Sequence, residues 1–201
     1  MKQVMVLKNM SSLKEILNKT KKEILHLLTF QEYTMQQLGK ILNINPCTAY
    51  QHVKVLEKEG LVEETRAEIE NYLPMRYYRA VAREFKVDYS DMNGEKDKDI
   101  EVTEWVKNRV KGLIDGLKAY NIEIPKESCC EAEELIAQLV NLENKIKEEI
   151  TPKNPEILEN ISSSIVEDIF YIIAHHYLNQ NKEYAELTEK LLNFLKKHET
   201  A

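Results

Sequence analysis

The chain has 201 residues, of which 43% are hydrophobic and 31% charged, a composition that allows one large or two small globular cores. No stretch approaches the roughly 20 uncharged apolar residues that a membrane span needs, and the first residues lack the apolar run and cleavage site of a secretory leader. We therefore expect a cytoplasmic protein with no membrane partner.

The net charge of −6 is unevenly divided along the chain. Residues 1–80 carry 12 Lys and Arg against 9 Glu, and the remainder carries 16 basic and 25 acidic side chains. A mildly basic front part therefore precedes a strongly acidic back part, and the negative total does not exclude a nucleic-acid partner for the front part.

The usual enzyme motifs are absent from the sequence. Cys47, Cys129 and Cys130 form neither an even disulfide framework nor a CxxC zinc pattern, and the five glycines form no phosphate-binding loop. There is no HExxH and no GxSxG motif. No catalysis, no cofactor and no metal site is expected.

The front part begins with helical periodicity. Apolar residues between Ser11 and Phe30 predict one or two helices. Next, Thr34 followed by Gln37 is a capping box, with Tyr33 placed to touch Leu38 across it, and this predicts a short helix from Met35 to about Leu42.

A second helix follows after a very short turn. Asn45 is a good cap, Pro46 suits the first helical position, and Gly60 ends the segment, so a helix from Pro46 to about Glu59 completes a helix-turn-helix. At 100° per residue, the two sides of this helix differ. The inward side is apolar, and the outward side is polar, with two residues flanking it: inward Ala49, Val53 and Leu56; outward Cys47, Tyr50, Gln51 and Lys54; flanking Thr48 and His52.

Two β-prone runs follow this helix, LVEETR at 61–66 and MRYYRAVA at 75–82, and they predict a hairpin whose tip lies anywhere from Ala67 to Leu73. A helix-turn-helix followed by a hairpin is a winged helix. Arg66, Arg76 and Arg79 are candidate phosphate contacts on the wing.

With these elements in place, residues 18–82 resemble the ArsR-type winged-helix transcriptional regulators, above all in LNINPCTAYQHVKVLEKEGLV with its HxKVL and EGLV segments. The resemblance implies a homodimeric repressor or activator that reads DNA with the Pro46 helix, and dimerisation through the helices behind the wing. Metal-sensing members carry paired cysteines in the first helix of the motif, and MQQLGKIL has none, so metal sensing there is not implied.

Residues 83–96 lose apolar periodicity and read as a linker. Behind it, four amphipathic segments predict helices that bundle within the chain, pair with a second copy, or both. Their apolar positions are Val102, Trp105, Val106, Val110, Leu113 and Leu117; Leu135, Ile136, Leu139, Leu142 and Ile146; Ile157, Ile161, Ile165, Ile169 and Ile173; and Tyr184, Leu187, Leu191 and Leu195. Gly112 and Gly116 inside the first segment indicate either the close approach of another helix or a bend.

Three features of the back part allow a functional and a structural interpretation, and the structural one is favoured for each. Cys129 and Cys130 are packing or surface cysteines rather than a thiol switch or metal ligands. The charged cluster Glu167, Asp168, His175 and His176 is solvated rather than metal-binding. The aromatic residues Trp105, Tyr120, Phe170 and Tyr171 belong to the core rather than to an effector pocket.

The sequence as a whole predicts a mainly α protein: a winged helix-turn-helix (a three-helix core plus a β-hairpin wing) at 11–82, a linker at 83–96, and a helical dimerisation region at 97–201, in which an effector is an additional candidate partner. The predicted function is that of a homodimeric regulator that binds double-stranded DNA in a sequence-specific manner. The alternative is a winged helix that serves as a protein-protein interaction module in a larger assembly. Predicted DNA contacts are Pro46, Cys47, Thr48, Tyr50, Gln51, His52, Lys54, Arg66, Arg76 and Lys40, with Lys21 and Lys22 adding positive charge.

Overall fold

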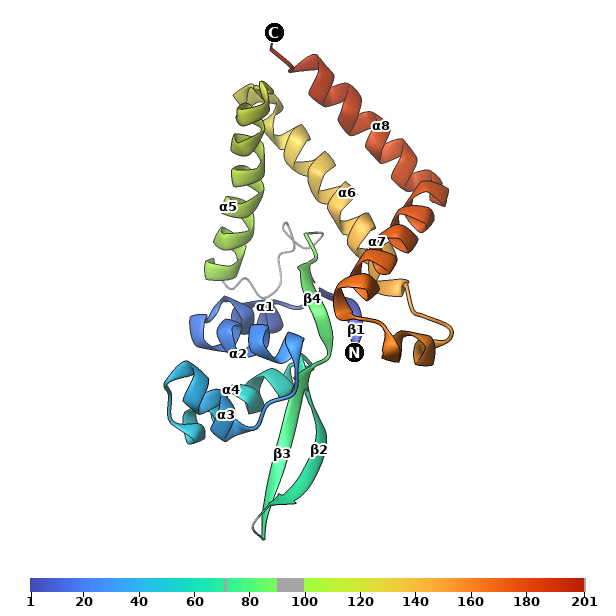
Figure 1. Ribbon diagram of the computed structural model, residues 1–201. Coiled ribbons are helices and arrows are strands. Elements are labelled where there is room, and N and C mark those ends of the chain that lie inside the picture. Colours follow the sequence, from blue (N-terminus) through green and yellow to red (C-terminus); the bar gives the residue numbers. More distant parts are fainter. Residues whose placement is uncertain (71, 90–99, 201) are drawn as a thin grey trace. The chain divides into compact units, whose positions relative to one another are not determined.

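The computed structural model describes residues 1–70, 72–89 and 100–200, and it shows a mainly helical chain with two small sheets. The chain divides into two compact units, Met1–Lys86 and Val87–Ala201 (Figure 1). Within the described ranges, none of the helices combines the length and the apolar character that crossing a membrane requires.

The front unit contains four helices in the predicted order. The first segment forms two helices, α1 (Met10–Leu17) and α2 (Lys19–Phe30), which meet at Asn18. The predicted capping box of α3 (Met35–Leu42) is confirmed: Thr34 Oγ1 accepts a hydrogen bond from the Gln37 backbone N–H at 3.3 Å, and Gln37 Oε1 accepts one from the Thr34 N–H at 2.8 Å. The last of the four, α4 (Pro46–Lys58), starts at the predicted proline.

The wing is a long antiparallel hairpin of β2 (Val62–Glu70) and β3 (Leu73–Ala80), which projects beyond the four helices (Figure 1). It is longer than the two predicted runs, because pairing continues from Ala67 opposite Arg76 to Glu70 opposite Leu73, and Tyr72 lies at the tip. A register shift between Glu64 and Arg66 marks a bulge in β2.

Main-chain hydrogen bonds attach the base of the wing to the helix-turn-helix. Tyr33, just before α3, and Tyr78 in β3 exchange two of them: Tyr33 N–H to Tyr78 O at 3.1 Å, and Tyr78 N–H to Tyr33 O at 3.0 Å. Tyr78 itself is almost fully buried. We name this pair of bonds the tyrosine bridge, because it fixes the start of α3 against the wing.

A second sheet pairs β1 (Lys2–Leu7) with β4 (Ala82–Val87). Neither strand was predicted, and residues 83–87 of the expected linker belong to β4. Residues 90–96 of that linker lie outside the described residues. The apolar side chains Val4, Val6 and Leu7 of β1 are buried, so this strand extends the core of the front unit.

The back unit contains α5 (Ile100–Leu117), α6 (Cys129–Glu149), α7 (Ser163–Gln180) and α8 (Lys182–Lys197), with three short 3₁₀ turns, η2 (Lys118–Tyr120), η3 (Lys126–Ser128) and η4 (Pro155–Asn160). Helix α6 contacts the other three helices. Ile114 of α5, Ala132 of α6 and Phe194 of α8 form a small core cluster.

Two expectations for this unit need correction. The predicted helical run through Ile157 and Ile161 is wrong, because Ile157 lies in the 3₁₀ turn η4 and Ile161 follows it, so that α7 starts at Ser163. An alanine Cβ at Gly112 or Gly116 would meet no atom within 4 Å outside its own helix backbone, so close approach of another helix in the described part of the chain does not explain these glycines, and the bend stays a prediction.

Candidate nucleic-acid interface

The turn between α3 and α4 is tight because of one glycine. An alanine Cβ at Gly39 would lie 2.8 Å from the Ile44 carbonyl oxygen and 3.3 Å from Pro46 Cγ, and the Ile44 N–H donates to the Gly39 carbonyl at 2.9 Å. Asn43 completes the reversal in the left-handed region with a φ of 53°. The start of α4 is therefore held directly against α3.

The buried side of α4 is as predicted. Ala49, Val53 and Leu56 are fully buried. The cap is also confirmed: Asn45 Oδ1 accepts a hydrogen bond from the Cys47 N–H at 2.8 Å. Helix α4 is thus fixed in rotation about its axis by three apolar side chains.

The opposite side of α4 presents the predicted outward residues near its N-terminal end. Pro46, Cys47, Tyr50 and Gln51 are exposed, Tyr50 with 49% of its surface accessible, and Thr48 is half-buried. Together they offer an aromatic ring, an amide, a hydroxyl and a thiol, the kinds of groups that contact base edges in a major groove.

Lys54 is less available than the sequence suggests. Its Nζ lies 2.6 Å from Glu57 Oε2, and 5.7 Å and 5.5 Å from the ring centres of Tyr50 and Tyr78. The hydrogen bond that Lys54 donates to the Glu57 carboxylate is the main reason that the pKa of Lys54 is raised. Lys54 is half-buried and part of a local cluster on α4 rather than a projecting cation.

His52 is half-buried on the flank of α4. Burial, and after it the positive charge of Lys21, lowers the pKa of His52 below the ordinary 6.5. The neutral ring is therefore favoured in the folded chain.

Two wing arginines are paired with glutamates. Arg66 Nε lies 2.8 Å from Glu32 Oε2, its Nη1 also pairs with Glu68, and its guanidinium lies 3.8 Å from the centre of the Tyr77 ring. Arg76 Nη1 lies 2.9 Å from Glu64 Oε2. Sequence reasoning counted these cations without the carboxylates that the hairpin places beside them.

The other predicted cations differ in their surroundings. Arg79 is half-buried, and its Nε is buried without a hydrogen-bond partner among the described residues. Lys21 pairs with Glu15. Lys22 and Lys40 are exposed and make no ion pair with another described residue, so they project their charge freely into solvent.

The wing tip carries two exposed apolar side chains that sequence reasoning did not select. Ile69 is 82% and Tyr72 is 99% exposed, and Tyr72 has a φ of 64°. The uncertain position of the tip in the sequence concealed them, because a one-residue change in register exchanges the faces of a hairpin.

The helix-turn-helix segment is similar to one known family of proteins. Residues 18–64, which run from the cap of α2 through α3 and α4 into β2, match the model of the family described as "Bacterial regulatory protein, arsR family". This segment of the chain is therefore similar to the arsR family. The arsR-type segment and the wing behind it form a winged helix, as the sequence resemblance implied, and the family is one of transcriptional regulators.

Three solved structures illustrate what this chain is similar to. The transcriptional regulator HlyU from Vibrio vulnificus is 24% identical, with 48% of this chain and 78% of that chain covered and a TM-score of 0.30. A homodimeric winged helix-turn-helix DNA-binding domain from Mycobacterium bovis, described as a possible ArsR-family regulator, is 20% identical, with 54% and 81% covered and a TM-score of 0.32. A ZitR variant from Lactococcus lactis in complex with DNA is 16% identical, with 70% and 84% covered and a TM-score of 0.29. No curated protein matches the chain.

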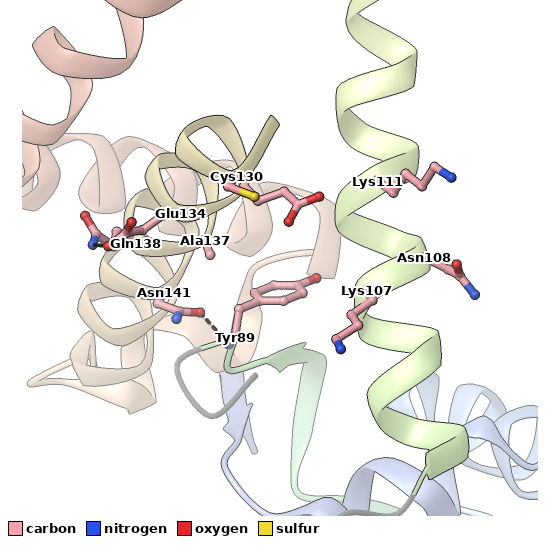
Figure 2. A pocket seen from close by; sticks show the side chains of 10 residues that line it. Tyr89, Lys107, Asn108, Lys111, Cys130, Glu134, Ala137, Gln138 and Asn141 are labelled. Carbon is pink, nitrogen blue, oxygen red and sulfur yellow. Dashed lines mark hydrogen bonds between the residues drawn. The ribbon is translucent and has the colours of Figure 1, made fainter. Parts of the chain in front are cut away.

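A cavity of about 820 Å³ in the back unit lies between α5 and α6 (Figure 2). Figure 2 shows the Tyr89 ring between the two helices, with the Tyr89 N–H donating to Asn141 Oδ1 at 2.7 Å. Arg109 Nε donates to the Tyr89 hydroxyl at 2.8 Å. Two lysines of α5 and two glutamates of α6 line the cavity: Lys107, Lys111, Glu133 and Glu134.

The aromatic residues considered for an effector pocket do not line this cavity. Phe170 is buried, whereas Tyr120 is exposed. Of the two adjacent cysteines, Cys130 lines the cavity, and the Cys129 thiol donates to the Pro125 carbonyl at 3.5 Å. In the described part of the chain no three His, Cys, Asp or Glu side chains are grouped as a metal site would need.

Proposed function

We propose that the chain is a cytoplasmic, non-enzymatic transcriptional regulator that binds double-stranded DNA as a homodimer and in a sequence-specific manner. Helix α4 enters the major groove, and the wing lies on the neighbouring backbone or minor groove. The observation that carries this proposal is the exposed row Cys47, Tyr50 and Gln51 on a helix whose other side is fully buried. A rigidly held polar row is what base recognition requires.

The roles of the side chains divide by chemistry. The amide of Gln51 and the hydroxyl of Tyr50 contact base edges, with Cys47 and Pro46 beside them at the helix start. Thr48, Lys54, Lys40, Arg66 and Arg76 contact phosphates, and His52 supports α4 from its flank. Two copies related by a twofold axis would read half-sites about 34 Å apart.

Three of these cations must exchange a carboxylate for a phosphate. Lys54, Arg66 and Arg76 each pair with a glutamate, and ion pairs that remain open to solvent, as these do, are weak enough to be displaced. We therefore expect strongly salt-dependent binding that is weaker than the number of cations alone indicates.

Substitutions on α4 test this function. Gln51→Ala should relax preference at one position of the site and cost about 1 to 3 kcal/mol on the preferred sequence, whereas Lys54→Ala should weaken all sequences alike. Binding sites are first selected from random DNA, and gel-shift competition across single-base variants then compares the two proteins. Equal losses on every variant for both substitutions would show that Gln51 reads no base.

A second candidate function is a protein-protein interaction module. The exposed Ile69 and Tyr72 and the paired arginines of the wing favour it, because exposed apolar side chains at the tip suit contact with a protein surface. Chromatography on immobilised DNA separates the two: the regulator elutes late and at a salt-dependent position, and the interaction module passes through.

A further inference from the structure

Helix α7 has two apolar faces. One is buried in the back unit, where α7 contacts α6 and α8, and it consists of Val166, Phe170, Ala174 and Leu178 at four-residue steps. The other lies on the opposite side of the helix, where Ile165, Ile169 and Ile172 are exposed. A helix that is apolar on both sides normally has a partner on both sides.

The spacing of the exposed face is that of a coiled coil. Ile165, Ile169, Ile172 and His176 recur at steps of four, three and four residues, which is the alternation of positions that meet in a two-helix seam. Ile172, near the middle, is 68% exposed. We name these four residues the α7 seam.

We propose that the α7 seam packs against the α7 seam of a second copy of this chain, with the two helices antiparallel about a twofold axis. The inference rests on the homodimer of the proposed function and deepens it by naming the surface through which the copies meet. It concerns α7 alone and does not depend on which DNA is bound.

The order of residues in the seam is symmetric. A twofold axis at the level midway between Ile169 and Ile172 places Ile169 opposite Ile172 of the partner subunit. The same axis places Ile165 opposite His176 of the partner subunit. Every seam position therefore meets another seam position, which an isologous contact requires, and α7 is about 27 Å long, enough for all four layers.

The charges beside the seam select the antiparallel arrangement. Asp168 and His175 lie on the same flank and are both exposed. Seven residues separate them by about 10 Å along one helix, too far for a hydrogen bond to each other. In the antiparallel pair, the positions of Asp168 and of His175 of the partner subunit along the helix axis differ by only about 3 Å. A parallel pair would instead place the flank of Asp168 and His175 against the opposite flank of the partner helix, which separates these two groups, and would align His176 with the same ring of the partner.

The first experiment measures self-association of the full chain by sedimentation velocity over a range of concentrations. Ile172→Glu places a carboxylate against Ile169 of the partner subunit and should weaken self-association by about 100-fold or more. Leu192→Glu is the matched control, because Leu192 is an exposed leucine of α8 outside the seam, and it should associate as the wild type does. Circular dichroism verifies that both variants are folded.

The second experiment tests the orientation. His175→Glu places a second carboxylate beside Asp168 of the partner subunit and should weaken the dimer, and adding Asp168→Lys should restore it. A double variant as weak as His175→Glu alone would overturn the antiparallel register.

The outcomes separate this inference from the proposed function. A dimeric wild type with an equally dimeric Ile172→Glu variant refutes the α7 seam and leaves the homodimer standing. A wild type that stays monomeric refutes both the seam and the homodimer, and DNA binding is then judged by the gel-shift comparison of Gln51→Ala and Lys54→Ala alone.

Discussion

Replacing Gly39 by alanine perturbs the turn on which the position of α4 depends. The new Cβ would lie 2.8 Å from the Ile44 carbonyl oxygen, a backbone atom, and 3.3 Å from Pro46 Cγ. Because neither neighbour is the end of a flexible side chain, relief requires a shift of the turn itself, and α4 must move with it.

Two opposing effects set the magnitude. Alanine is about 1 kcal/mol more favourable than glycine inside a helix, and Gly39 lies within α3. Steric crowding in a well-packed site typically costs about 1 to 3 kcal/mol. The crowding exceeds the gain, so we expect Gly39→Ala to lower the free energy of unfolding by about 1 kcal/mol.

The same substitution in α5 is the control. At Gly112, a Cβ meets nothing within 4 Å, so Gly112→Ala should gain the helix preference alone and stabilise by up to about 1 kcal/mol. Urea unfolding is followed by far-UV circular dichroism for the whole chain and by fluorescence of Trp105, the only tryptophan, for the back unit. DNA affinity should fall for Gly39→Ala and stay unchanged for Gly112→Ala.

The reasoning is refuted if Gly39→Ala stabilises the chain as much as Gly112→Ala does. Such a result would mean that the turn between α3 and α4 yields without strain. It would then follow that the position of α4 is not set by the contact at Gly39.

Three further predictions concern the same unit. Glu64→Gln releases Arg76 from its ion pair and should raise DNA affinity severalfold at most, as measured by fluorescence anisotropy. The control Glu63→Gln removes an equal charge from the neighbouring residue, and its DNA affinity should rise less. Leu56→Ala opens a cavity at a fully buried position and should lower the free energy of unfolding by about 2 to 5 kcal/mol, which a urea titration checks; a loss below 1 kcal/mol would contradict the burial. The pKa of His52 is lowered below 6.5 on folding, so the unfolded chain takes up this proton first as the pH falls. The free energy of unfolding should therefore decrease below about pH 6.5, and it should decrease less steeply in His52→Gln. Identical slopes of unfolding free energy against pH in the two proteins would count against the effect.

Local signals in the sequence predicted the helix-turn-helix closely. The start of α3 follows from Thr34 and Gln37, and the start of α4 from Asn45 and Pro46, because caps are satisfied by residues only two or three positions away. The buried side of α4 followed from periodicity, since each turn of a helix repeats the same face.

The structural features that depend on residues far apart in the sequence were not predicted. Strand β1 is short and was not recognised, because its pairing with β4 joins residues some 80 positions apart. The pairing of Arg66 with Glu32 likewise depends on where the wing meets the segment before α3. The break after Ile161 was missed since isoleucine at four-residue steps fits a helix whether or not the chain forms one there.

The tyrosine bridge has a mechanical consequence. Its two bonds join main-chain atoms of Tyr33 and Tyr78, so they persist whatever side chains evolution installs at these positions. A force that tilts the hairpin is passed to the beginning of α3, and the crowded corner at Gly39 passes it on to α4. In the proposed DNA complex, a shift of the wing on the DNA backbone would therefore change the orientation of α4 toward the bases.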